Sequence, residues 1–159
     1  MKISIVCVGK IKEKYWRDAV AEYEKRLSRY AKVEILEAAD EKTPDGAGEA
    51  LEAQIKRREG ERMERLLKED AYVIALTIDG KMYDSVGFAE RIEKIGLSGK
   101  GQIVFLIGGS LGMDEELLKH ADERVSFGRM TYPHQMMRVI LLEQIYRAYR
   151  ILKGEPYHK

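Results

Sequence analysis

The sequence has 159 residues, of which 45% are hydrophobic and 35% are charged, and its formal net charge is +1. This length and composition predict one globular domain with its own hydrophobic core. A charge so close to zero provides no general basic field for nucleic acid, although a local basic patch could still contact RNA. The first apolar run, residues 3–8, is too short for a membrane span or a signal peptide. We therefore expect a cytoplasmic protein with no membrane partner.

The N-terminal half alternates strand and helix patterns. Residues 3–9 predict a central strand ended by glycine, in which Cys7 is a buried, reduced thiol. Residues 33–38 are mixed in polarity and predict a strand nearer an edge, followed by a loop at residues 40–48. The helical patterns cover about residues 13–30, with Trp16, Val20, Tyr23 and Leu27 on one face, and residues 49–70, whose many charges indicate a solvated face.

The C-terminal half continues the alternation. A third apolar strand at residues 71–78 is closed by Asp79-Gly80, and Asp84 or Ser85 can cap the next helix, which ends at Gly96 or Gly99. The remaining predicted elements are a strand at 103–107, a glycine loop, a short helix, a strand at 124–127, a loop at 128–133 and a helix at about 134–152. The continuous apolar strands predict a parallel α/β sheet.

Two loops stand out because each follows an apolar strand. Residues 108–112 read Gly-Gly-Ser-Leu-Gly, and residues 128–133 form the second loop. Open α/β sheets bind ligands at the carboxyl ends of their strands, and glycine lets a ligand approach the backbone. Residues 108–112 lack the lysine of a phosphate-binding P-loop and do not have dinucleotide spacing, so a plain structural turn is an equally good interpretation.

Other candidate sites are weaker. His120, His134 and His158 have no carboxylate or cysteine at metal-ligand spacing, so we predict no metal. No nucleophile elbow is present, which disfavours covalent hydrolysis. The basic cluster could contact RNA phosphates or be a solvated face; it consists of Lys10, Lys12, Lys14 and Arg17.

The last predicted helix has an unusually wide apolar surface. Only a thin strip of it is polar, formed by Glu143, Arg147 and Arg150. One sheet face cannot bury so much of a helix, so we expect it also to pack against a second subunit. Arg138 near its start could then bind an anion or form an interface salt bridge.

Three stretches together resemble a known family. They are FLIGGSLG (105–112), SFGRMTYPHQMMRVILLEQIYRAYRI (126–151) and KGEPYHK (153–159), and residues 8–30 are similar too. The pattern is similar to the ribosomal large-subunit pseudouridine N3-methyltransferases, small enzymes of the SPOUT class. The similarity covers essentially the whole chain, and PHQMMR with the Tyr157-His158 ending makes it specific.

The resemblance implies a single SPOUT domain over residues 1–159 whose part from about 71 to 159 forms a trefoil knot. It implies S-adenosyl-L-methionine as cofactor and a homodimer that methylates N3 of a pseudouridine in 23S rRNA of the assembled ribosome. The cofactor contacts would be Leu76, Gly108, Phe127, Gly128, Arg129, Met130, Thr131 and Tyr132. His134, Arg138, Tyr157 and His158 are the candidates for target positioning and proton removal, with the tail reaching a site completed by the other subunit.

Two alternatives stay open at this point. The first is a non-catalytic, ribosome-associated binding protein that keeps the fold. The second is an α/β nucleotide-binding enzyme that uses Gly108–Gly112 for phosphates.

Overall fold

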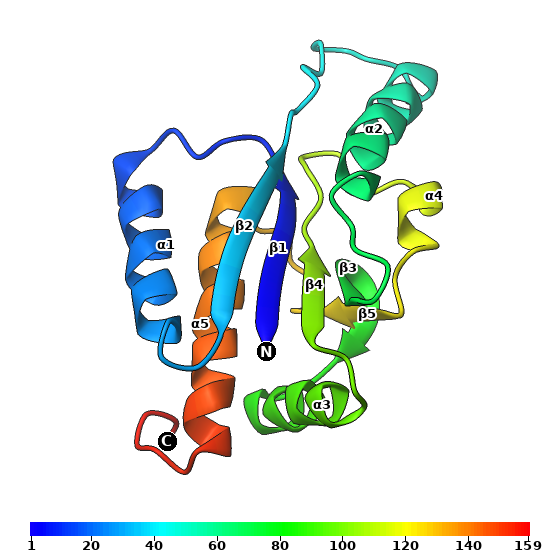
Figure 1. Cartoon of the computed structure of the whole chain (residues 1–159). Coiled ribbons are helices and arrows are strands. Elements are labelled where there is room, and N and C mark those ends of the chain that lie inside the picture. Colours follow the sequence, from blue (N-terminus) through cyan, green and yellow to red (C-terminus); the bar gives the residue numbers. More distant parts are fainter.

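The computed structural model describes residues 1–159 as an α/β domain around a five-stranded parallel sheet of order β2-β1-β4-β3-β5 (Figure 1). The strands are β1 (Lys2–Val8), β2 (Lys32–Ala38), β3 (Tyr72–Met82), β4 (Gln102–Leu106) and β5 (Glu123–Ser126). The helices are α1 (Lys14–Leu27), α2 (Glu49–Glu64), α3 (Ser85–Leu97), α4 (Glu115–Leu118) and α5 (His134–Leu152). The parallel α/β class predicted from the continuous apolar strands is confirmed.

The helices cover both faces of the sheet. Alternate side chains of β1 point to opposite sides, so Ile3 and Ile5 join a core with α1, α3 and α5, while Val6 and Val8 join a second core with α2 and α4. Figure 1 shows α2 and α4 together on one side of the sheet and α1 and α5 beside each other. Burial on both faces explains why the central strands lack polar alternation.

The expected edge and core positions are confirmed for the first strands. β2 is one of the two edge strands and pairs along its whole length with β1. Cys7 is buried, and this burial raises the pKa of its thiol to about 11, so the thiol is an inert core group.

The third strand differs from its prediction. The sequence predicts that this strand ends at Asp79-Gly80, but β3 continues to Met82. It pairs with β5 on both sides of a bulge, so that Leu76 and Lys81 are each opposite Val125. A Cβ on Gly80 would lie 2.7 Å from backbone atoms of Arg124 and Val125. This glycine therefore allows β3 to run against β5 instead of ending a strand.

The charged helix is also shorter than predicted. α2 ends at Glu64 rather than near residue 70, and Leu66 and Leu67 pack against the core from the following turn. The interpretation of its charges as a purely solvated face is wrong at one position, because the side chain of Glu59 is only 6% exposed.

The last helix matches its predicted bounds, with Pro133 immediately before it. Its buried residues face the core that it shares with α1 and α3, while Met136, Val139 and Ile140 are only partly buried. None of the helices combines the length and the apolar composition that a membrane span needs.

Candidate active site

The bulge of β3, the carboxyl end of β4 and the segment after β5 enclose a cleft of about 710 Å³. This volume is in the usual range for small-molecule sites. Its walls come from three segments that are distant in sequence, which are residues 76–79, residues 107–113 and residues 127–134. The sheet order explains why these three segments lie together, because β3 lies between β4 and β5 and all three strands run parallel.

The glycine loop forms one wall with its backbone. A Cβ on Gly108 would lie 2.8 Å from the backbone carbon of Gly112, so no side chain fits there. The loop folds back on itself through a hydrogen bond of 3.0 Å from the Gly112 N–H to the Gly109 carbonyl, and Gly112 has φ +85. These contacts leave a bare peptide surface facing the cleft.

The charges around this loop do not suit a phosphate. The first turn of α4, which follows the loop, contains Glu115 and Glu116, and Glu115 lines the cleft. Arg124 also lines the cleft, but it lies 3.5 Å from the Glu115 carboxylate and 3.9 Å from that of Asp79. An acidic rim whose one arginine is already paired favours a cationic ligand over a polyphosphate.

The loop after β5 forms the opposite wall. Ser126 holds its first turn, because the Gly128 N–H donates to the Ser126 hydroxyl at 3.0 Å. Gly128 has φ +115, which few other residues adopt readily. Phe127 packs edge-on against Phe88 at 6.1 Å, while Met130 is 76% exposed. One wall is thus anchored to the core at its start and open to solvent near its tip.

The cleft contains seven of the eight predicted cofactor residues. They are Leu76, Gly108, Phe127, Gly128, Met130, Thr131 and Tyr132. Arg129 lies in the same loop but is not among the lining residues. Phe127 and Gly128 also line a neighbouring cavity of about 520 Å³.

His134 is the one predicted catalytic residue that lines this cleft. Its Nδ1 is buried and has no hydrogen-bond partner. Burial and the nearby positive charge of Arg138 lower the pKa of His134, against the opposing effect of the Asp40 and Glu13 carboxylates. The imidazole is therefore neutral at pH 7 and can accept a proton.

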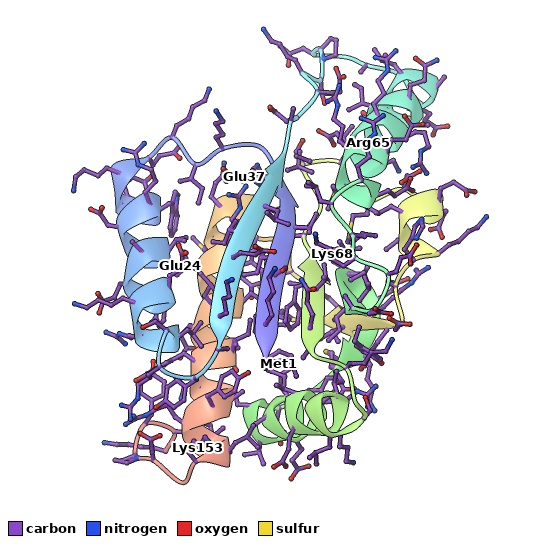
Figure 2. The ribbon with its side chains drawn as sticks, in the orientation of Figure 1. Met1, Glu24, Glu37, Arg65, Lys68 and Lys153 are labelled. Atoms are coloured by element: carbon purple, nitrogen blue, oxygen red, sulfur yellow. The ribbon has the colours of Figure 1, made fainter.

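Arg138 lies one helical turn further along α5 and is 1% exposed. Its guanidinium donates to Glu37 at 2.7 Å and to the carbonyls of Val8 and Gly9 at 3.0 and 2.8 Å. These bonds tie the start of α5 to the carboxyl ends of β1 and β2, where Figure 2 shows Glu37. In this chain Arg138 has intramolecular partners, so a role in contacting RNA stays a prediction.

The tail lies elsewhere in the same chain. The Tyr157 hydroxyl donates to Glu143 at 3.1 Å, and the His158 Nδ1 is 3.2 Å from the Arg147 guanidinium. Burial, followed by the Glu143 carboxylate, raises the pKa of Tyr157 to about 12. Figure 1 shows the C-terminus beside the last turn of α5, away from the carboxyl ends of β1 and β2. His158 lines the neighbouring cavity, and neither tail residue lines the cofactor cleft.

The basic cluster spans the loop after β1 and the first turn of α1, and all four side chains are exposed. Lys14 pairs with Asp18 at 2.7 Å, and Arg17 donates to the Lys12 carbonyl at 3.1 Å. The cluster follows the carboxyl end of β1, the edge of the sheet on which the cleft opens.

Sequence reasoning missed two residues near the cleft. Thr77 lines it and has a buried Oγ1 without a partner. Glu59 packs behind the glycine loop, against Gly109. The available signal for Glu59 was its neighbour Gly60, since an isolated glycine in a helix often has a packing reason. No group of three or more His, Cys, Asp or Glu side chains is placed to hold a metal ion.

Comparisons with known proteins agree with this geometry. The family described as predicted SPOUT methyltransferase matches residues 1–158. Proteins named ribosomal RNA large subunit methyltransferase H are 59% identical in Bifidobacterium adolescentis, 57% in Clostridium novyi and 55% in Listeria monocytogenes, each over 100% of both chains.

A solved structure shares the fold. It is a probable methylase family protein from Haemophilus influenzae, with a TM-score of 0.56 and 14% identity over 99% of this chain and 70% of that one. The family match over residues 1–158 and the full-length identities of 55–59% agree with the parallel sheet and its glycine-walled cleft. This chain belongs to the SPOUT methyltransferase family and is a methyltransferase.

Proposed function

We propose that the protein methylates N3 of a pseudouridine in 23S rRNA of the assembled ribosome, with S-adenosylmethionine as donor. The observation that supports this most directly is the cleft that joins Leu76, Gly108 and the 127–132 loop at one edge of the sheet. The names of the full-length relatives support a ribosomal RNA substrate. Action on ribosomes implies a cytoplasmic location.

The residues of the cleft fit this donor. Adenine needs a slot with apolar contacts and backbone groups, and Leu76, Phe127 and the bare peptides of Gly108 and Gly128 offer both. The acidic rim of Asp79 and Glu115 suits a positively charged sulfonium. When bound, S-adenosylmethionine supplies an electrophilic methyl group.

The chain must then orient the target base and take its N3 proton. His134 is suited to accept that proton, because it lines the cleft and its lowered pKa keeps the imidazole neutral. Tyr157 and His158 of the same chain lie away from the cleft. They would serve the reaction only if a partner subunit brought its tail to this edge.

A homodimer would meet that need. Met82 and Val86 are 66% and 42% exposed, and they line the neighbouring cavity with Ile140 of α5. This apolar surface adjoins the cleft through Phe127 and Gly128. We propose that a second copy covers it and that its Tyr157 and His158 complete the site.

We also propose the trefoil knot over residues 71–159. The support is local: β3 pairs with β5 before and after a four-residue bulge, and Gly80 lies against the β5 backbone. A chain threaded beside β5 would account for so close an approach of the two segments.

The proposal is tested by following the methyl group. Purified protein, tritium-labelled donor and ribosomes from a strain without the endogenous enzyme should give one labelled pseudouridine in 23S rRNA. Assembled ribosomes should be modified far better than protein-free rRNA. A Gly108→Val variant should lose the reaction, because its side chain would collide with the Gly112 backbone. Label that appears only in another nucleotide, or none at all, would refute the proposal.

A rival assignment is tested by calorimetry. A nucleotide-binding enzyme would bind ATP or NAD, whose phosphates the acidic rim disfavours. The proposal instead predicts binding of S-adenosylmethionine and of S-adenosylhomocysteine, which shares its adenosine.

A further inference from the structure

Glu59 is a buried carboxyl group that the proposed reaction does not use. It lies in the last half of α2 and is one of only four buried polar or charged residues in the chain. Burying a carboxylate is costly unless it is well bonded, so its surroundings indicate what it does.

The first contact of Glu59 is with the chain leaving β2. Its Oε2 accepts a hydrogen bond of 3.1 Å from the Glu41 N–H. Arg62, less than one turn further along α2, donates to the Ala39 carbonyl at 2.9 Å and also pairs with the Glu41 carboxylate. Residues 39–41 are therefore held to α2 by both side-chain and backbone groups.

The second contact is with the glycine loop. Glu59 Oε1 lies 3.2 Å from the place where a Cβ would stand on Gly109, so the carboxyl fills the space that this glycine leaves. Next to it, Arg57 donates to Asp114 at 2.7 Å. A Cβ on Gly60 would lie 2.4 Å from the Asp114 carboxylate, so the helix and the loop are in close contact.

Residues 39–41 also approach the reacting side of the cleft. A Cβ on Gly9 would be 3.8 Å from the side chain of Asp40, and the Gly9 carbonyl accepts a hydrogen bond of 2.8 Å from Arg138, one turn after His134 on α5. The segment bound by one oxygen of Glu59 thus reaches the catalytic edge, while the loop beside its other oxygen forms the cofactor wall.

We propose that Glu59 is a positioning residue that couples the cofactor loop, residues 108–112, to residues 39–41, the start of the 39–48 loop beside the catalytic edge. Occupation of the cleft fixes the glycine loop, and the buried carboxyl transmits that order to the segment after β2. This inference rests on the cofactor assignment proposed above, because it names the cofactor as the ligand that orders the loop.

A supporting property is the environment of the carboxyl. The pKa of Glu59 is raised, mainly by burial and further by the Asp40 and Glu41 carboxylates. The Glu41 N–H and Arg62 oppose this shift. Its hydrogen bond to the Glu41 backbone is thus made in a partly desolvated setting, where such bonds are strong and their loss is costly.

Hydrogen–deuterium exchange with S-adenosylhomocysteine as probe tests the coupling. In the wild type, the probe should slow exchange at residues 108–112 and also at residues 39–48. In Glu59→Ala, it should still protect residues 108–112 but no longer residues 39–48. Glu59→Gln keeps an acceptor for the Glu41 N–H and should retain most of the coupling.

Matched kinetics add a second readout. Glu59→Ala should raise the KM for the donor by about tenfold, with a smaller change in kcat at saturating donor, because a buried hydrogen bond and the packing behind the glycine loop are both lost. The control is Glu61→Ala in the same helix, whose exposed carboxylate has only a 3.5 Å contact with Arg57 and should leave KM unchanged.

The outcomes are distinguishable. If the wild type fails to bind S-adenosylhomocysteine, both this inference and the proposed cofactor are wrong. If the probe binds but residues 39–48 of the wild type are unaffected, or if Glu59→Ala keeps the coupled protection, only the role of Glu59 is wrong. If the alanine variant does not fold, unchanged exchange at residues 39–48 of the wild type still overturns the proposal.

Discussion

The two halves of the sheet are built in different ways. On one side, β1 pairs in unbroken register with β2 from Lys2 to Val8 and with β4 from Lys2 to Val6. On the other side, β3 and β5 are paired before and after a bulge, and residues of this bulge line the cleft together with the loops that follow β4 and β5. The regular half has uninterrupted strand pairing, whereas the irregular half interrupts its pairing at the bulge, where the cleft is formed. Stability and ligand binding are thus divided between neighbouring strands.

The largest expected effect is at Gly80, where β3 approaches the backbone of β5. Gly80→Val places a side chain within 2.7 Å of the β5 backbone, which cannot move without losing its pairing. We expect a loss of about 3 kcal/mol or more, or roughly 10 °C in Tm, measured by thermal unfolding. Gly101→Ala, in the regular half, has no atom within 4 Å and should leave Tm nearly unchanged. Equal melting temperatures for the two variants would remove the distinction between the halves.

The next prediction distinguishes the role of the tail in methylation from the role of the cleft in cofactor binding. Deleting Tyr157–Lys159 should reduce methylation by about a hundredfold or more, because target positioning is lost while the cleft is intact. Binding of S-adenosylhomocysteine, measured by calorimetry, should be unchanged. Lys159→Ala alone is the control and should behave as the wild type. A truncated enzyme that methylates normally would show that the tail has no role.

A third effect concerns proton removal at the cleft. The wild-type rate should rise with pH through the lowered pKa of His134 and become flat above it, because only the neutral imidazole accepts a proton. His134→Ala should be slower by about a hundredfold at neutral pH. Its deficit should shrink at high pH, where N3 of the target ionises without help.

The charged neighbours of His134 must be kept in that experiment. They are Arg138, Asp40 and Glu13, whose charges act on its titration. A His134→Ala profile parallel to the wild type at every pH would assign the proton to another acceptor.

The smallest effect tests the basic cluster on the regular half. Replacing Lys10, Lys12 and Lys14 by alanine should weaken binding to rRNA, and the slope of log K against log salt should fall by about one for each lost phosphate contact. A matched triple variant at Lys32, Lys94 and Lys100 removes the same charge from the amino-terminal edge of the sheet and should keep the wild-type slope. Identical slopes for both variants would show that the basic cluster is a solvated face without RNA contacts.

Much of the regular half could be predicted from local pattern. The strand at residues 3–9 and the last helix at residues 134–152 were recognised because apolar period and turn residues are local properties. Leu76, Gly108 and Phe127 could be assigned to one pocket because parallel strands bring their carboxyl ends to one edge.

The sequence by itself thus determined the fold class, the strand and helix order and most of the cleft residues. Only the tertiary structure decided that β3 continues past Gly80, that Glu59 is buried and that Arg138 binds inside the chain while the tail lies away from the cleft. The physical reason is that periodicity reports which face of an element is apolar. It does not report which distant backbone or charged group a polar side chain meets once those faces are packed.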